Sequence, residues 1–366
     1  MSRFSGFLKR KDIEISAKRY GVEALGAMAQ GLFATLLIGT IINSVGSLFH
    51  IPFLTAPIFT TAGGTAYRLG DFAAAMSGPA MAAAIGYALK APPLVLFSLI
   101  TVGFSSNMLG GAGGPLAVFI VAIIACECGK MVSKETKVDI IVTPMVTIGI
   151  GVFLSWLIAP AIGRGAMAVG GFIMWATDLQ PFFMGIIVSV SVGIALTLPI
   201  SSAAICAALG LTGLAGGAAL AGCCAQMVGF AVISFRENKW GGLISQGIGT
   251  SMLQMGNIVK NPRIWTAPII TSAITGPIAT CLFKLEMNGP AVSSGMGTCG
   301  LVGQIGVYTG WAKDIASGKI SEISIFDHLS LWMISVILPA VIAPVIHYFV
   351  RKKGLVKDGD LSLENQ

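Results

Sequence analysis

Long stretches without a single charged residue constrain this chain more than any other feature. The longest covers residues 179–235, and six more share the property: 24–67, 91–126, 140–163, 264–283, 287–312 and 328–350. A helix needs about 20 apolar residues to cross the ~30 Å hydrocarbon core of a membrane. The runs 179–235 and 24–67 are each long enough for about two crossings. Single crossings near 72–89, 140–162, 241–258, 263–283, 287–311 and 328–350 bring the total to about ten, so the pattern predicts an all-α polytopic membrane protein with about ten transmembrane helices.

The overall composition excludes the main alternatives to a membrane protein. Hydrophobic residues make up 55% of the chain and charged residues only 11%, against roughly 25% charged in soluble domains. The mean hydropathy is +0.84. A soluble fold of this length has too small a core for so much apolar surface, and a disordered chain would be polar and charged.

The net charge of +7 comes from basic residues that gather at the two ends of the chain. Basic residues that flank apolar segments mark the cytoplasmic side of a membrane, so this charge indicates a membrane rather than a nucleic acid. Both termini are therefore expected in the cytoplasm, which requires an even number of spans. If every earlier run crossed the membrane, the basic loop at 130–137 would lie on the side opposite the cytoplasm, against the preference of basic residues for the cytoplasmic side. This conflict leaves the topology of residues 50–130 open.

The order of apolar, broken and charged stretches predicts five regions. Residues 1–20 form a basic cytoplasmic arm and residues 351–366 a cytoplasmic tail. Residues 21–162 form a transmembrane half whose small residues favour close helix packing, as in a scaffold or a dimer interface. Residues 163–180 are short and end in charges, as an interfacial linker would. Residues 181–350 form a second transmembrane half, which we expect to bind the substrate.

Two segments of the second half are poor candidates for simple spanning helices. Residues 198–226 are rich in Gly and Ser, and residues 284–300 contain a turn at Asn288-Gly289-Pro290. Irregular backbone at membrane depth persists only where protein or a water-filled cavity surrounds it. Interrupted segments of this kind often carry the substrate site of a transporter. The first segment therefore indicates either a re-entrant hairpin or a tightly packed Gly/Ala helix pair.

Glu286 is the leading candidate for a substrate ligand. A carboxylate accepts hydrogen bonds from sugar hydroxyls, and ionisable groups at membrane depth usually serve a function. The alternative is that Lys284 and Glu286 mark a loop at the membrane surface. Hydroxyls and amides both donate and accept, although such groups often only join helices. The remaining candidate substrate-binding residues are Asn288, Ser293 and Ser294 of one broken segment, facing Ser201, Ser202 and Gln226 of the other, and Asn257.

The sequence offers no catalytic, cofactor-binding or metal-binding motif. Residues 295–300 match G-x-G-x-x-G, but they follow no strand and lie in an apolar run, so dinucleotide binding is rejected. The seven cysteines form no metal-ligand pattern, and the three histidines are scattered. We therefore expect no enzyme activity, no cofactor and no metal in this chain.

Three stretches resemble one family of bacterial membrane proteins: residues 16–42, 198–230 and 256–303. The family is the phosphotransferase-system EIIC-like proteins of the putative toxin regulator, or PfoR, type. The resemblance implies a glucose-superfamily EIIC fold in the bacterial inner membrane. It also implies a homodimer, two re-entrant hairpins, and a substrate domain that moves like an elevator.

The sequence departs from sugar-transporting EIIC proteins in one respect. Related families often carry an Asn-Glu-Pro-like element whose Glu binds the sugar, whereas here Gly289 stands between Asn288 and Pro290. Glu286 is the candidate substitute. The termini are short, so phosphoryl coupling would need separate EIIA and EIIB partners.

The leading functional hypothesis is a translocator of a small polar solute, such as a sugar, by alternating access. The alternatives are a membrane ligand sensor that regulates gene expression and a true EIIC that relies on separate partners.

Overall fold

The structure is a computed structural model that describes residues 3–61, 63–64 and 66–363. The chain forms two compact units. Within the described residues, unit 1 contains 3–36 and 73–165, and unit 2 contains 37–72 and 166–363. Apart from a two-residue antiparallel pairing of β1 (Phe59–Thr60) with β2 (Ala66–Tyr67), the regular elements are helical. The prediction that the fold is helical is therefore confirmed.

Unit 1 is built from the N-terminal arm and a group of apolar helices. Its helices are α1 (Arg3–Arg10), a π-helix (Arg19–Ala24), α2 (Leu25–Leu32), α6 (Ser77–Ala88), α7 (Pro93–Gly110), a 3-10 turn (Gly111–Gly113), α8 (Gly114–Val132) and the first part of α9 (Asp139–Thr177). The chain reverses between α7 and α8, which pack against each other. Gly111 permits this turn because its φ of +51° is one that few other residues adopt.

Buried polar contacts fasten the basic arm to the rest of unit 1. Arg19 forms a two-pronged ion pair with Asp12, at 2.8 and 3.2 Å, and also donates to the carbonyl of Leu89. Lys130, only 2% exposed, donates to the carbonyls of Asp12 and Leu89 and pairs with Glu127. These two cations therefore donate hydrogen bonds to the free Leu89 carbonyl at the C-terminal end of α6, where positive charge is favoured by the helix dipole. The same contacts hold the arm in place.

Unit 2 begins with α3 (Ile38–Leu48), α4 (Pro52–Thr55), β1, β2 and α5 (Leu69–Ala75), which runs into unit 1. A π-helix (Phe33–Leu37) precedes α3. The longer elements that follow are α10 (Pro181–Thr197), α11 (Ser202–Ala208), α12 (Gly213–Ile233), α13 (Phe235–Ile244), α14 (Met255–Lys260), α15 (Thr266–Pro277) and α16 (Val302–Ala316). The last, α17 (Ile325–Trp332), continues through Met333–Ile337 into α18 (Leu338–Lys352).

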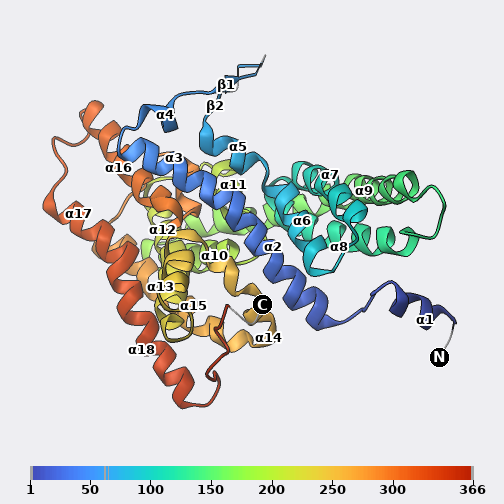
Figure 1. The fold of residues 1–366 in the computed structure, drawn as a ribbon. Coiled ribbons are helices and arrows are strands. Elements are labelled where there is room, and N and C mark those ends of the chain that lie inside the picture. The colour runs from blue at the N-terminus through green and yellow to red at the C-terminus, as the bar shows by residue number, and fades with distance from the viewer. Residues whose placement is uncertain (1–2, 62, 65, 364–366) are drawn as a thin grey trace. The chain divides into compact units, whose positions relative to one another are not determined.

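Short 3-10 and π turns connect these helices. They are Ser245–Gly249, Ser251–Gln254, Pro262–Trp265, Ile278–Leu282, Ala291–Gly295 and Cys299–Leu301. The core of unit 2 is α12, which is almost wholly buried among α10, α15 and α18 (Figure 1). Its Gly- and Ala-rich sequence lets the neighbouring helices approach closely.

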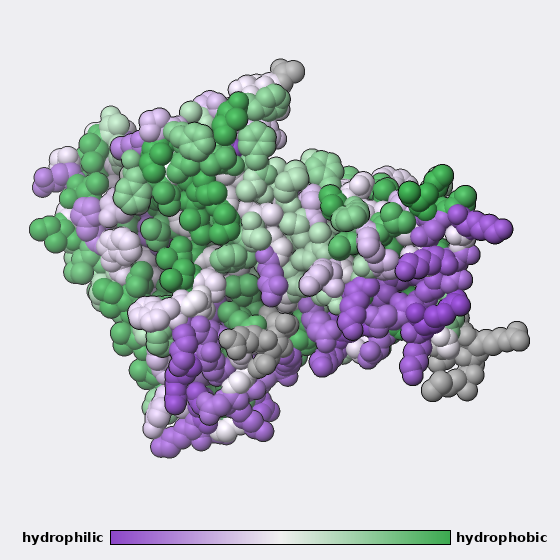
Figure 2. All heavy atoms as spheres, in the orientation of Figure 1, coloured by the Kyte–Doolittle hydropathy of each residue, from purple (hydrophilic) through white to green (hydrophobic). Residues whose placement is uncertain are grey.

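Six helical segments among the described residues are long and apolar enough to cross a membrane. They are Arg19–Ser47, Pro93–Val132, Asp139–Thr177, Gly213–Ile233, Pro262–Leu282 and Ile325–Lys352. The shorter helix Pro181–Thr197 is also apolar. The chain is therefore a multi-pass membrane protein, while the number of ten spans stays a prediction. Figure 2 shows apolar side chains over much of the visible surface and hydrophilic ones around the C-terminal end of α18.

The region expected to be a linker, 163–180, is mostly helical. Residues up to Thr177 continue α9, and the border between the two units falls after Gly165. Residues 37–72 belong to unit 2 rather than to the unit that contains most of 21–162. The reason lies in packing, because α3 contacts α16 and the 3-10 turn at Cys299–Leu301.

Candidate functional site

The two broken segments of the sequence lie against each other within unit 2. The first contains α11, a turn, and the start of α12, and the second runs from an extended stretch into the turns at Ala291–Gly295 and Cys299–Leu301. Gly213 and Met287 exchange two backbone hydrogen bonds of 3.0 and 2.9 Å. This pairing satisfies backbone groups that no helix satisfies, as irregular structure in an apolar protein requires.

Two serine hydroxyls reinforce this contact. Ser202 Oγ donates to the carbonyl of Gly295 at 2.7 Å, and Ser294 Oγ donates to the carbonyl of Leu211 at 2.6 Å. Both side chains are buried. Ser201 instead caps the start of α11, where its hydroxyl accepts from the Ala204 N–H. The sequence analysis names these serines as candidate substrate ligands, and in the structure the hydroxyls of Ser202 and Ser294 join the two segments.

Glu286 lies at the centre of a polar cluster just beyond the end of α15 and its π turn. Asn288 Nδ2 donates to Glu286 Oε2 at 2.9 Å and to Asp314 Oδ2 at 2.8 Å. Lys319 Nζ lies 3.1 Å from Glu286 and 3.7 Å from Asp314. We call these four residues the Glu286 cluster. Its two carboxylates share one ammonium and one amide, so they retain free acceptor capacity.

The Glu286 cluster lines a pocket of about 270 Å³ in unit 2. Phe283 and Trp311 add aromatic walls, and Asp327 of α17 also lines it. The Glu286 side chain is 47% exposed and that of Asp314 is 17% exposed. Aromatic faces beside acceptors and donors are the combination that holds a polar ligand with an apolar face.

Hydrogen bonding and charge keep the carboxylate of Glu286 ionised. The hydrogen bond from Asn288, with the contribution of Lys319, holds the pKa of Glu286 below its usual value of 4.5. The same pairing raises the pKa of Lys319. Both groups are therefore charged throughout the neutral range.

The pocket lies at one end of the long helix formed by α17 and α18. Asp327 and Ser330, at the start of α17, line the pocket, whereas Arg351 and Lys352 end α18. The 28 residues between Ile325 and Lys352 span about 42 Å at 1.5 Å per residue, which exceeds the thickness of the hydrocarbon core. The pocket and the basic end of α18 thus lie at opposite ends of a helix that is long enough to cross a membrane.

The other predicted ligands have different partners. Gln226 is fully buried, accepts from Trp265 Nε1 at 2.7 Å and donates to Ser272 Oγ at 3.2 Å. It therefore joins α12 to α15 and its preceding turn. Ser293 is also buried, at the turn before Gly295. Among the described residues, no recorded hydrogen bond joins either side chain to the Glu286 cluster.

Asn257 holds the C-terminal tail. Its Nδ2 donates to the carbonyl of Ser362 at 2.9 Å and to Gln254 Oε1 at 2.8 Å. Gln254 and Asn238 both donate to the carbonyl of Leu361, at 3.0 and 2.8 Å. These amides donate to backbone carbonyls of the tail, a role that no local pattern in the sequence indicates.

Sequence reasoning missed Asp314, Lys319 and Trp311. Asp314 lies two positions and Lys319 seven positions beyond the charge-free run that ends at residue 312. That position indicates the end of a helix, but nothing in their spacing in the sequence predicts that they lie next to Glu286 in the folded chain. Within the part of the chain that the structure describes, no group of three or more His, Cys, Asp or Glu side chains could hold a metal ion.

These features define a helical, multi-pass membrane protein with a small polar pocket. The family model of the phosphotransferase system EIIC component matches residues 22–363. The chain therefore belongs to the phosphotransferase system EIIC family. No curated protein and no solved structure matched it in the same comparisons. EIIC proteins are the membrane components of sugar transport and are not catalytic on their own.

Proposed function

We propose that this chain translocates a sugar and that the Glu286 cluster is its outward-facing binding site. The observation that carries the proposal is the convergence of Glu286, Asp314, Asn288 and Lys319 on one pocket with aromatic walls. Carboxylates accept from sugar hydroxyls, while the amide and the ammonium donate to them. Trp311 and Phe283 would cover the apolar face of a sugar ring.

The orientation follows from charge. Arg351, Lys352 and Lys353 close the last helix, and such residues favour the cytoplasmic side. The pocket at the opposite end of that helix would then meet sugar arriving from outside. Both termini are accordingly proposed to be cytoplasmic, in a bacterial inner membrane.

Alternating access would come from movement of unit 2. This unit contains both broken segments and all eight predicted ligands, while unit 1 forms a separate compact body. We propose that unit 2 carries the sugar in an elevator-like motion and that unit 1 serves as the scaffold of a homodimer. The two broken segments, held together by Ser202 and Ser294, would act as paired re-entrant hairpins in this motion.

The experiment that tests transport is counterflow into proteoliposomes that contain the purified chain. We expect at least one labelled sugar from a panel of hexoses, disaccharides and sugar alcohols to accumulate against its unlabelled form. Addition of EIIB and phosphorylated EIIA, whose phosphoryl group passes through EIIB to the sugar, would convert the product to a sugar phosphate if the chain is a coupled EIIC.

If folded protein gave no counterflow with any sugar of the panel, this result would contradict the hypothesis that the chain is a translocator. Sugar binding without counterflow would instead support the sensor, which the narrower resemblance to the putative toxin regulators also suggests.

Sugar binding is expected to be independent of pH between about pH 5 and about pH 8. A lowered pKa means that Glu286 stays ionised at every pH above its usual 4.5. The contribution of the carboxylate is therefore present above that value and is lost as the pH falls through the lowered pKa. Isothermal titration with the transported sugar measures this, and a midpoint near neutral pH would contradict the assignment of Glu286.

A further inference from the structure

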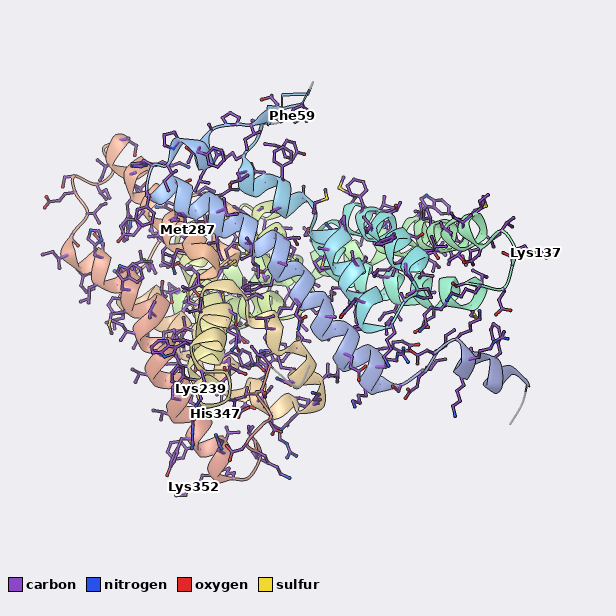
Figure 3. All side chains as sticks on the ribbon, viewed as in Figure 1. Phe59, Lys137, Lys239, Met287, His347 and Lys352 are labelled. Carbon is purple, nitrogen blue, oxygen red and sulfur yellow. The ribbon has the colours of Figure 1, made fainter. Side chains whose placement is uncertain are left out.

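A second cavity lies at the opposite end of unit 2 from the Glu286 cluster. It has a volume of about 500 Å³ and is formed by α12, the start of α13 and the end of α18. We call it the α18 pocket. Its lining residues are Val232, Ile233, Arg236, Pro344, His347, Tyr348, Arg351 and Lys352. Figure 3 shows His347 and Lys352 on the last turns of α18.

His347 is the most unusual residue of the α18 pocket. Its side chain is only 6% exposed, and neither ring nitrogen has a hydrogen-bond partner among the described residues. Buried polar groups are almost always paired, so an unpaired imidazole that lines a cavity calls for an explanation. A ligand that accepts a hydrogen bond from the ring would supply the missing partner.

The charge of the pocket selects the kind of acceptor. Arg236, Arg351 and Lys352 line it, and no carboxylate of residues 3–61, 63–64 or 66–363 does. Two carboxylates lie near these cations. Arg351 pairs with the exposed Asp358 of the tail, and Glu237, next to Arg236 in the chain, accepts from the backbone N–H of Leu361. The cations still outnumber these neighbouring carboxylates, which favours an anion. Guanidinium groups bind phosphate through paired hydrogen bonds.

The walls of the pocket indicate where that phosphate comes from. Val232, Ile233 and Pro344 are apolar, and Tyr348 is 62% exposed at the end of a spanning helix. Aromatic and basic residues at the ends of spanning helices contact lipid headgroups. Basic pockets between spanning helices on the cytoplasmic side can bind anionic headgroups.

We propose that the α18 pocket binds the phosphate of an anionic phospholipid. His347 and Arg236 donate to the phosphate oxygens, Arg351 and Lys352 complete the positive surface, and the acyl chains lie along Val232 and Pro344. This assignment does not depend on the sugar site, because the two pockets share no residue.

The test uses the full chain in a neutral detergent, titrated with phosphatidylglycerol and followed by native mass spectrometry. Phosphatidylcholine with the same acyl chains is the lipid control, and inorganic phosphate and glycerol 3-phosphate are the soluble controls. We expect tight binding of phosphatidylglycerol alone. Arg236→Gln should weaken it about tenfold or more, the effect of losing a charge-assisted hydrogen bond.

Arg263→Gln is the matched control, because Arg263 is also exposed in unit 2 but does not line the pocket. It should leave phosphatidylglycerol binding within about twofold of the wild type. Lys352→Gln provides an independent test if Arg236→Gln fails to fold. Equal binding of the two lipids, or equal effects of the pocket and control substitutions, would overturn the proposal. Equally tight binding of glycerol 3-phosphate would assign the pocket to a soluble phosphate ester instead.

Discussion

Sugar counterflow by the Glu286→Gln variant is expected to be at least about tenfold slower than by the wild type. Glutamine has nearly the same shape as glutamate, but it lacks the negative charge that pairs with Lys319 and the second strong acceptor. In the proposed site the sugar loses a charge-assisted hydrogen bond, which is about twice as strong as a neutral one. The measurement is counterflow of the sugar that the wild type accumulates, together with its binding affinity by titration.

Glu322→Gln is the control for this substitution. Glu322 is exposed in the same loop region as Lys319 but does not line the pocket. Its replacement removes one carboxylate and should leave counterflow within about twofold of the wild type. Glu286 is itself half-exposed, so its variant should melt at nearly the wild-type temperature. Unchanged counterflow in the Glu286 variant would remove this residue from the binding site.

Gly222→Ala is expected to destabilise unit 2 severely. A methyl group on Gly222 would lie 1.8 Å from the carbonyl oxygen of Ser189, at the crossing of α12 and α10. The obstacle is backbone rather than a mobile side chain, so the two helices must move apart. Overpacking of this kind costs about 1–3 kcal/mol or more. We expect a lower melting temperature in detergent and a smaller yield of monodisperse protein.

Gly171→Ala is the matched control, since it is also a helical glycine of unit 2 and a methyl group there meets nothing within 4 Å. Alanine is the better helix former by up to about 1 kcal/mol. This variant should therefore be at least as stable as the wild type. Equal stability of both variants would show that α10 and α12 pack less closely than described.

The fold class of this chain could be predicted from the sequence because membrane insertion depends on local apolar length. Charge-free runs such as 179–235 and 328–350 each supplied a helix long enough to span, or nearly to span, the bilayer. The resemblance of residues 198–230 and 256–303 to EIIC-like proteins agrees with the family match over 22–363. The two broken segments were also visible, because Gly and Pro interrupt helices through their own backbone properties.

The partners of the polar residues could not be predicted in the same way. Gln226, Asn257 and Glu286 all read as candidate ligands, since amides and carboxylates have the same chemistry wherever they lie. In the folded chain Gln226 hydrogen-bonds with Trp265, Asn257 with the tail, and Glu286 with Lys319 and Asn288. Except for Asn288, these partners lie 33 or more positions away along the chain.

The sequence by itself thus determined that this is a helical, multi-pass membrane protein of the EIIC family with two interrupted segments. Hydropathy and helix interruption depend on neighbours along the chain, so they can be read directly. Only the tertiary structure decided that Ser202 and Ser294 join those segments and that Asp314 and Lys319 complete the pocket of Glu286. The physical reason is that such contacts form between residues brought together by helix packing, and the sequence pattern of a helix does not specify its neighbour.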